Sequence, residues 1–232
     1  MPTRDGGETR FGAVVRADSV RQLSDDGWQA LVQHGVRTVV DLRGHDERED
    51  DPPAELPVEV VHVPFFESSD EELHEMAAEL EAAVMAAPDV PTATRDVYLI
   101  FLERFRANIA DAVRAVAHAS AGGVVIHCVG GKDRTGLLSA FLLHLAGVAD
   151  DEIAADYALS EERLRPRHEA WFAAAESEEQ LERLRRIAQT PAASMAGVFE
   201  ELARRYGGVD AYLRSAGVDD EELGLVRTRL RG

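Results

Sequence analysis

The decapeptide HCVGGKDRTG, residues 127–136, contains the only cysteine and the only lysine of the chain. A cysteine is a strong nucleophile once its thiol is ionised, and cationic neighbours together with a helix N-terminus favour that ionisation. Arg134 stands six positions after Cys128, so in a tight loop its planar guanidinium could fold back and bind two oxygens of an anion. The pattern therefore predicts a thiolate nucleophile and an anion clamp directed at one centre.

The residues around the decapeptide predict a strand, a loop and a helix. The apolar run GGVVIHC at 122–128 has the length of a strand, and a long apolar helical pattern begins near Asp133. Glycines in the loop can take positive φ and turn backbone N–H groups into one concavity, to which the helix adds its own free N–H groups and dipole. Such a concavity binds phosphate. The expected loop contacts are Val129, Gly130, Gly131 and Lys132.

Apolar runs of strand length alternate with helical patterns along the chain, which predicts an α/β fold. We expect a mainly parallel central sheet flanked by helices, with a helical C-terminal part packed alongside. A single domain over 1–232 is expected, with residues 69–95 as either a helical lid or a plain surface cover, and residues 150–232 as a helical subregion. The expected strands are 12–17, 36–43, 58–66 and 122–128, and the expected helices before the decapeptide are 24–35, 70–87 and 95–119.

The composition restricts the partners. Asp and Glu number 43 against 25 Lys and Arg, giving a net charge of −18, which disfavours nucleic acid and anionic membranes. One cysteine excludes an intramolecular disulfide and multi-cysteine zinc motifs. The N-terminal sequence does not look like a signal peptide, and the most apolar stretch is too short to span a bilayer. We therefore expect a cytoplasmic protein without membrane insertion, metal or cofactor.

The arrangement H-C-x5-R-T resembles the signature loop of the cysteine-dependent protein tyrosine phosphatase superfamily. The fuller form HCxxGKDRTG resembles the atypical bacterial tyrosine/serine phosphatase branch, some of whose members also accept phosphoinositides. Similarity to that branch extends over nearly the whole chain. It includes Gly6, Gly7, Thr9 and Gly12, then Asp41-Leu42-Arg43, then Glu47, and the C-terminal stretch 204–230.

The resemblance implies a two-step reaction. Cys128 attacks phosphorus to form a phosphocysteine, and water then hydrolyses it to inorganic phosphate. Thr135 resembles the family's hydroxyl that hydrogen-bonds the thiolate, and His127 is expected to support the loop. The implied substrates are phosphorylated proteins, with phosphotyrosine ranked first, phosphoserine or phosphothreonine second, and phosphoinositides third.

The proton donor to the leaving group has two candidates. Asp133 is favoured because phosphatases with Asp directly before the loop arginine are thought to use it as the acid. A carboxylate beside Arg134 and a helix N-terminus is, however, stabilised as an anion, which suits a proton donor less well. Asp41 follows its own strand at the same sheet edge and is the second candidate, with Arg43 orienting it or contacting substrate.

The decapeptide also admits interpretations other than a phosphatase. A lone cysteine is commonly an inert core residue, but the spacing to Arg134 argues against this here. A rhodanese-type sulfurtransferase also places a cysteine between strand and helix, and a non-catalytic phosphate-binding module would keep the loop. The acidic run at 45–50 is expected to be a solvated loop.

Overall fold

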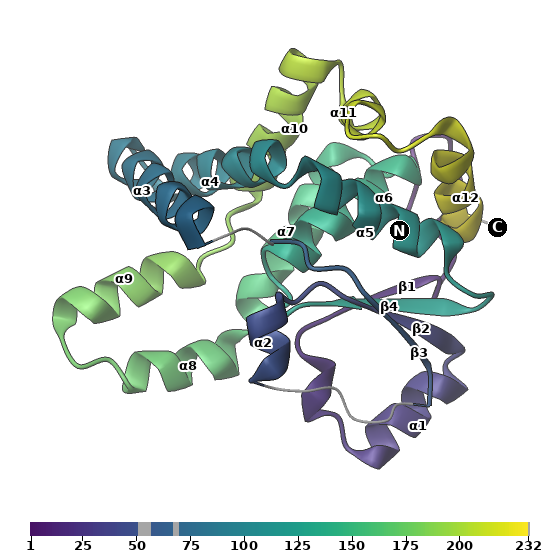
Figure 1. Cartoon of the computed structure of the whole chain (residues 1–232), viewed down its shortest axis with the longest axis horizontal. Coiled ribbons are helices and arrows are strands. Elements are labelled where there is room, and N and C mark those ends of the chain that lie inside the picture. Colours follow the sequence, from purple (N-terminus) through teal and green to yellow (C-terminus); the bar gives the residue numbers. More distant parts are fainter. Residues whose placement is uncertain (51–56, 67–69, 232) are drawn as a thin grey trace.

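The computed structural model describes residues 1–50, 57–66 and 70–231, and its centre is a parallel sheet (Figure 1). Four strands lie in the order β1-β4-β2-β3, and every neighbouring pair is parallel. The predicted α/β fold with a mainly parallel sheet is confirmed. The strands are β1 Val14–Ala17, β2 Val36–Asp41, β3 Glu59–His62 and β4 Gly123–His127.

The two central strands are buried on both faces because helices cover the sheet on both sides. Val39 and Val125 face a small apolar cluster around Trp28 of α1 (Asp25–Gln33). Val40 and Ile126 face the main core, which includes side chains of α5 (Arg106–His118) and α6 (Arg134–Leu145). The sheet thus holds the C-terminal ends of β2 and β4 rigidly at one edge.

The predicted helix over 95–119 is wrong in its extent. The chain forms α4 (Val90–Arg104) and α5, which meet at Phe105, where φ is −108° and ψ is 30°. α4 begins earlier than predicted, at Val90, because Asp89 caps the helix by accepting from the Thr92 N–H at 2.8 Å. α3 (Asp70–Ala86) packs along α4, so 70–86 and 90–95 of the expected cover are helical, while residue 69 lies outside the described residues.

The chain beyond the decapeptide is helical, as predicted from its pattern. α10 (Ala192–Tyr206) packs against α4 and α7 (Asp150–Arg163), and α12 (Asp220–Arg231) packs against α5 and α6. α8 (Arg165–Ala173) and α9 (Glu178–Ala188) form a hairpin that projects away from the sheet in Figure 1. No helix of the described residues is long and apolar enough to cross a membrane. The remaining helix of this part, α11 (Val209–Ser215), packs against α6 and α10.

Candidate active site

Residues 128–134, called the phosphate loop below, connect the end of β4 to the start of α6. Gly131 has φ +64°, and a Cβ on it would lie 2.6 Å from the carbonyl oxygen of Ala17 in β1, so only glycine fits there. Gly130 does not have positive φ, and a Cβ on it would meet nothing within 4 Å. The expectation that both glycines supply positive φ is therefore correct for Gly131 alone.

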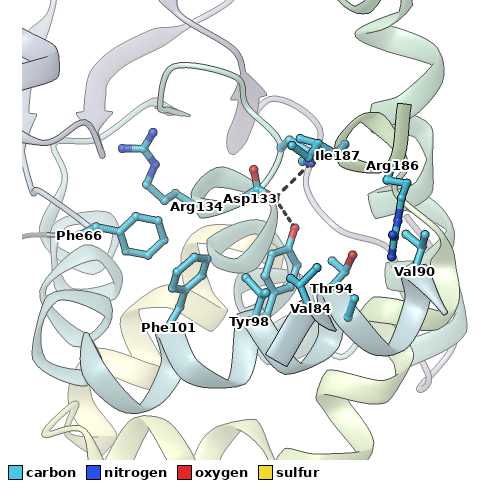
Figure 2. A pocket seen from close by; sticks show the side chains of 13 residues that line it. Phe66, Val84, Val90, Thr94, Tyr98, Phe101, Asp133, Arg134, Arg186 and Ile187 are labelled. Atoms are coloured by element: carbon cyan, nitrogen blue, oxygen red, sulfur yellow. Dashed lines mark hydrogen bonds and ion pairs between the residues drawn. The ribbon is translucent and has the colours of Figure 1, made fainter. Parts of the chain in front are cut away.

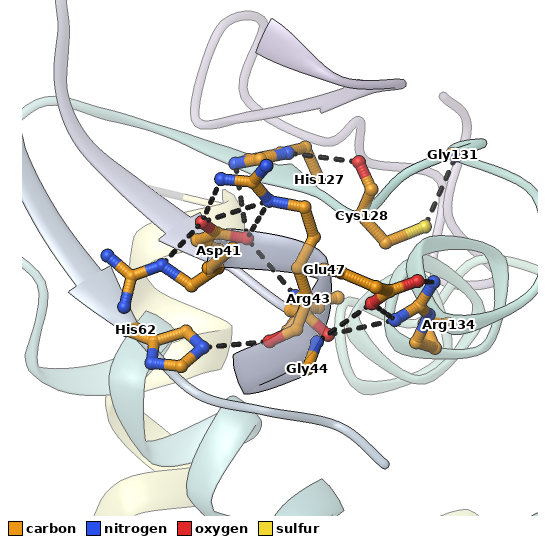
Figure 3. A network of polar contacts seen from close by, with 11 residues as sticks. Asp41, Arg43, Gly44, Glu47, His62, His127, Cys128, Gly131 and Arg134 are labelled. Atoms are coloured by element: carbon orange, nitrogen blue, oxygen red, sulfur yellow. Dashed lines mark hydrogen bonds and ion pairs between the residues drawn. The ribbon is translucent and has the colours of Figure 1, made fainter. Parts of the chain in front are cut away.

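Cys128 lies at the floor of the phosphate loop. Its residue is 2% exposed, and its sulfur accepts a hydrogen bond from the Gly131 N–H at 3.2 Å (Figure 3). The N–H groups of Val129, Gly130 and Lys132 make no hydrogen bond to any other described residue. One amide thus stabilises a negative sulfur, and further amides of the same loop remain available to an anion.

Three contacts, called the braces below, hold the phosphate loop from outside. The guanidinium of Arg16 in β1 donates to the Gly131 carbonyl at 3.2 and 3.1 Å. Arg167 of α8 donates to the Val129 carbonyl at 2.8 Å, and Lys132 donates to the Ile187 carbonyl of α9 at 2.6 Å. Because the braces bind two of the loop's carbonyls from behind, they favour a loop whose amides point toward the sulfur.

Arg134 is held by a residue that the sequence analysis did not place in the site. Its terminal nitrogens both donate to the Glu47 carboxylate, with Nη2 at 2.8 Å from Oε1 (Figure 3). Burial lowers the pKa of Arg134, but the hydrogen bond to Glu47 and the nearby Cys128 outweigh this effect, so the net pKa of Arg134 lies above its usual value. Arg134 is therefore a permanent cation whose plane is fixed beside Cys128.

Glu47 belongs to a short helix, α2 (His45–Glu49), so the prediction of a solvated loop at 45–50 is wrong for most of its length. The Glu47 carboxylate also accepts from the Gly44 N–H at 2.8 Å, which closes the first turn of α2. This hydrogen bond points the carboxylate across to the phosphate loop. In the sequence, the only indication that Glu47 belongs to the site was its place after Asp41-Leu42-Arg43 in the pattern that resembles the phosphatase branch.

Asp41 and Arg43 form a buried ion pair behind the phosphate loop. Asp41 is 1% exposed. Its carboxylate accepts hydrogen bonds from Arg43 Nε at 3.0 Å, from Arg43 Nη2 at 2.9 Å and from the Arg43 backbone N–H at 3.1 Å. Burial would raise the pKa of Asp41, but the bonds from Arg43 hold that pKa below its usual 3.8. A buried anion bound this tightly is poorly suited to give a proton to a substrate. The guanidinium of Arg43 is directed at Asp41.

His127 and Thr135 flank the phosphate loop in sequence. His127 is buried, and its Nδ1 donates to the Cys128 carbonyl at 3.1 Å, consistent with the expected support of the loop. Burial is the main reason that the pKa of His127 lies below its usual 6.5. Thr135 is fully buried, and its hydroxyl has no hydrogen-bond partner among the described residues. The expected bond from Thr135 to the sulfur is therefore not formed in this structure.

Asp133 stands at the opening of the site. Its Oδ1 accepts from the hydroxyl of Tyr98 in α4 at 2.7 Å and lies 3.5 Å from Nζ of Lys132 (Figure 2). The Asp133 side chain is 43% exposed, against 2% for Asp41. Of the two acid candidates, Asp133 is the one with a solvent-exposed carboxylate.

A cavity of about 320 Å³ lies beside the phosphate loop. Figure 2 shows Asp133 between Arg134 and Phe66 on one side and Arg186 on the other. The guanidinium of Arg134 lies 5.5 Å from the centre of the Phe66 ring. The remaining wall is mainly apolar and comes from α3, α4 and the end of α9: Val84, Val90, Ala93, Thr94, Val97, Tyr98, Phe101 and Ile187.

No group of three or more His, Cys, Asp and Glu side chains in the described part of the chain could hold a metal ion. The candidate residues Cys128, Arg134 and Asp133 are brought together by the phosphate loop itself. Asp41, Arg43 and His127 lie behind it as a supporting layer. Tyr98 and Arg16 were not predicted as site residues, because nothing in their local sequence marks them.

The comparisons with known proteins agree with this geometry. Residues 1–232 match the family described as the tyrosine phosphatase family. The chain belongs to that family. It is 29% identical over 230 residues to a tyrosine-protein phosphatase of Nostoc commune, covering 94% of this chain and 74% of that one. It is also 28% identical over 255 residues to the triple specificity protein phosphatase PtpB of Mycobacterium tuberculosis, covering 96% of this chain and 92% of that one.

As a member of the tyrosine phosphatase family, the chain is a phosphatase, an enzyme that hydrolyses phosphoric monoesters. The resemblance inferred from HCVGGKDRTG is confirmed. Family membership disfavours the sulfurtransferase alternative, and the presence of both Cys128 and Arg134 disfavours a non-catalytic phosphate-binding module.

Proposed function

We propose that this enzyme hydrolyses phosphotyrosine in proteins through a phosphocysteine on Cys128. The observation that carries the proposal is the geometry of the phosphate loop. The Cys128 sulfur lies against the Gly131 N–H and beside the Arg134 guanidinium, and the other N–H groups of the loop have no partner among the described residues. The amides and Arg134 bind the phosphate oxygens and stabilise the charge that develops on them in the transition state. Glu47 leaves the Nε edge of the guanidinium available for these oxygens.

In the first step the thiolate attacks phosphorus while the bond to the leaving oxygen breaks. Asp133 donates a proton to that oxygen, which contributes typically 10²–10⁴-fold in such reactions. We assign this role to Asp133 rather than to Asp41, because Asp41 is a buried anion bound by Arg43. In the second step water attacks the phosphocysteine, Asp133 accepts its proton, and the thiolate and inorganic phosphate are released.

The preference for phosphotyrosine rests on the cavity beside the loop. Its wall next to Arg134 carries the rings of Phe66, Phe101 and Tyr98, so an aryl phosphate could place its own ring against aromatic surface. Phosphoserine and phosphothreonine have no ring that could pack against these aromatic side chains. Phosphoproteins as substrates also agree with the names of the relatives, one of which is a triple specificity protein phosphatase.

The substrate test is a phosphate-release panel with Cys128→Ser as the blank. Phosphotyrosine peptides should give the highest kcat/KM, followed by phosphoserine and phosphothreonine peptides and then phosphoinositide vesicles. Cys128→Ser should release no phosphate from any of them but should still bind a phosphotyrosine peptide, because the amides and Arg134 are unchanged. Wild-type rates in Cys128→Ser would refute the phosphocysteine, and a higher kcat/KM on phosphoinositides would refute the ranking.

A further inference from the structure

We propose that Tyr98, supported by Tyr157, is a positioning residue that fixes which carboxylate oxygen of Asp133 gives its proton to the leaving group. The proposal rests on the proposed function, in which Asp133 is the acid. It concerns two tyrosines that come from α4 and α7 and meet at the phosphate loop.

The three side chains form a chain of short hydrogen bonds. The Tyr98 hydroxyl lies 2.7 Å from Asp133 Oδ1 and 2.8 Å from the Tyr157 hydroxyl. Both tyrosines are 1% exposed, and their rings meet edge to face with centroids 6.1 Å apart. Two buried rings in contact cannot shift without repacking the core, so the Tyr98 oxygen is a fixed point for Asp133.

The direction of the hydrogen bonds follows from the donors available. A phenol has one hydrogen to donate, and a carboxylate can only accept. Tyr98 therefore donates to Asp133 and accepts from Tyr157. Burial, and after it the charge of Asp133, raises the pKa of Tyr98 well above its usual 10.0, so this hydroxyl keeps its proton across the working range of pH.

Asp133 consequently has two different oxygens. Oδ1 accepts from Tyr98 and lies 3.5 Å from the Lys132 ammonium, whereas Oδ2 has no hydrogen-bond partner among the described residues. An oxygen that already accepts from a phenol beside a cation is the poorer place for a proton. The proton of the acid form therefore sits on Oδ2, and Tyr98 stops the carboxyl group from rotating to exchange the two.

The reaction then balances at Oδ2. As the bond from sulfur to phosphorus forms, the leaving oxygen departs with the proton from Oδ2 of Asp133. In the second step the attacking water passes a proton back to Oδ2, and the bond from sulfur to phosphorus breaks. Tyr98 stays protonated in both steps.

The experiment compares Tyr98→Phe with wild type on two aryl phosphates. Phenyl phosphate has a poor leaving group that needs the acid, and 2,4-dinitrophenyl phosphate has a good one that does not. The quantity is kcat/KM, which reports the step that breaks the ester bond. Removing the hydroxyl should reduce kcat/KM for phenyl phosphate at least about tenfold, a part of the 10²–10⁴ that acid catalysis supplies, and that for the dinitrophenyl ester less than about threefold.

Two further tyrosine variants separate positioning from packing. Tyr157→Phe removes only the outer bond of the chain, so it should show the same selective loss with smaller size. The matched control is Tyr212→Phe, because Tyr212 is also fully buried and its hydroxyl donates to the Leu102 carbonyl at 2.7 Å, away from Asp133. Tyr212→Phe should change both substrates equally or not at all.

The outcomes distinguish this proposal from the proposed function. Equal losses on the two esters in Tyr98→Phe, or no loss, would overturn the role of Tyr98 if Asp133→Asn still shows the selective loss. An Asp133→Asn variant without selective loss would overturn the assignment of Asp133 as the acid and this proposal with it. If wild type hydrolyses neither ester, the proposed function itself fails.

Discussion

Replacement of Glu47 by glutamine tests whether the orientation of Arg134 is essential for catalysis. The amide keeps the shape of the carboxylate but loses its charge, so the paired bonds to the two terminal nitrogens of Arg134 are reduced to a weaker neutral contact. Arg134 would keep its charge yet lose the partner that fixes its plane. The variant therefore changes the position of the phosphate clamp and not the presence of the clamp.

The size of the effect follows from the contact. A hydrogen bond to a charged group contributes about 1.5–3 kcal/mol, and the Glu47 side chain is 36% exposed, so solvent screening favours the lower part of that range. A loss of about 1.5–2 kcal/mol in the transition state corresponds to a roughly ten- to thirtyfold reduction in kcat/KM. We expect this reduction on p-nitrophenyl phosphate for Glu47→Gln.

The control is Glu49→Gln, an exposed position in the same short helix, which should retain the wild-type kcat/KM. Circular dichroism and the free energy of unfolding would establish that both variants fold. A folded Glu47→Gln variant with the wild-type kcat/KM would show that Arg134 does not need its partner, and the reasoning from the ion pair would be refuted.

Two predictions concern stability. Because the folded pKa of Asp41 lies below its usual 3.8, the pair with Arg43 stabilises fully above that pH and loses its effect as pH falls through the lower folded value. Asp41→Asn should lower the free energy of unfolding in urea at pH 7 by about 3–5 kcal/mol, and it should flatten the fall of that free energy between pH 7 and pH 3. A variant with the wild-type pH profile of stability would contradict this contribution of the ion pair. Gly131→Ala would place a Cβ 2.6 Å from the Ala17 oxygen, so it should lower the free energy of unfolding by about 1–3 kcal/mol and remove most of the kcat. The control Gly130→Ala should keep the wild-type stability. Equal stabilities of the two variants would contradict the clash at Gly131.

The nucleophile and the clamp could be predicted from the sequence because they lie in one short loop. Between Cys128 and Arg134 the chain has only to turn once, so residue types and spacing suffice to place both at one centre. The same is true of the strand before them and the helix after them, whose apolar patterns are local. Local sequence therefore predicted where Cys128 and Arg134 lie relative to each other.

The partners of these residues could not be predicted in that way. Glu47 is 87 positions from Arg134, and Tyr98 is 35 positions from Asp133, so each contact depends on how separate elements pack. The acidic run that holds Glu47 has the composition of an exposed loop, and only the capping bond to Gly44 turns its carboxylate inward. The division of the predicted helix at Phe105 has the same cause, since that residue is 3% exposed and its ring packs against Phe66 at 4.9 Å.

The braces also have a consequence for the order in which the enzyme is made. Two of them come from α8 and α9, so they reach back 38 and 55 positions to the phosphate loop. A ribosome delivers the loop before these helices, and domains complete their packing only when the distant segments have been synthesised. The nascent chain thus carries its reactive cysteine without the contacts that shape its surroundings, and catalytic competence is acquired late, after residue 187 has emerged and docked.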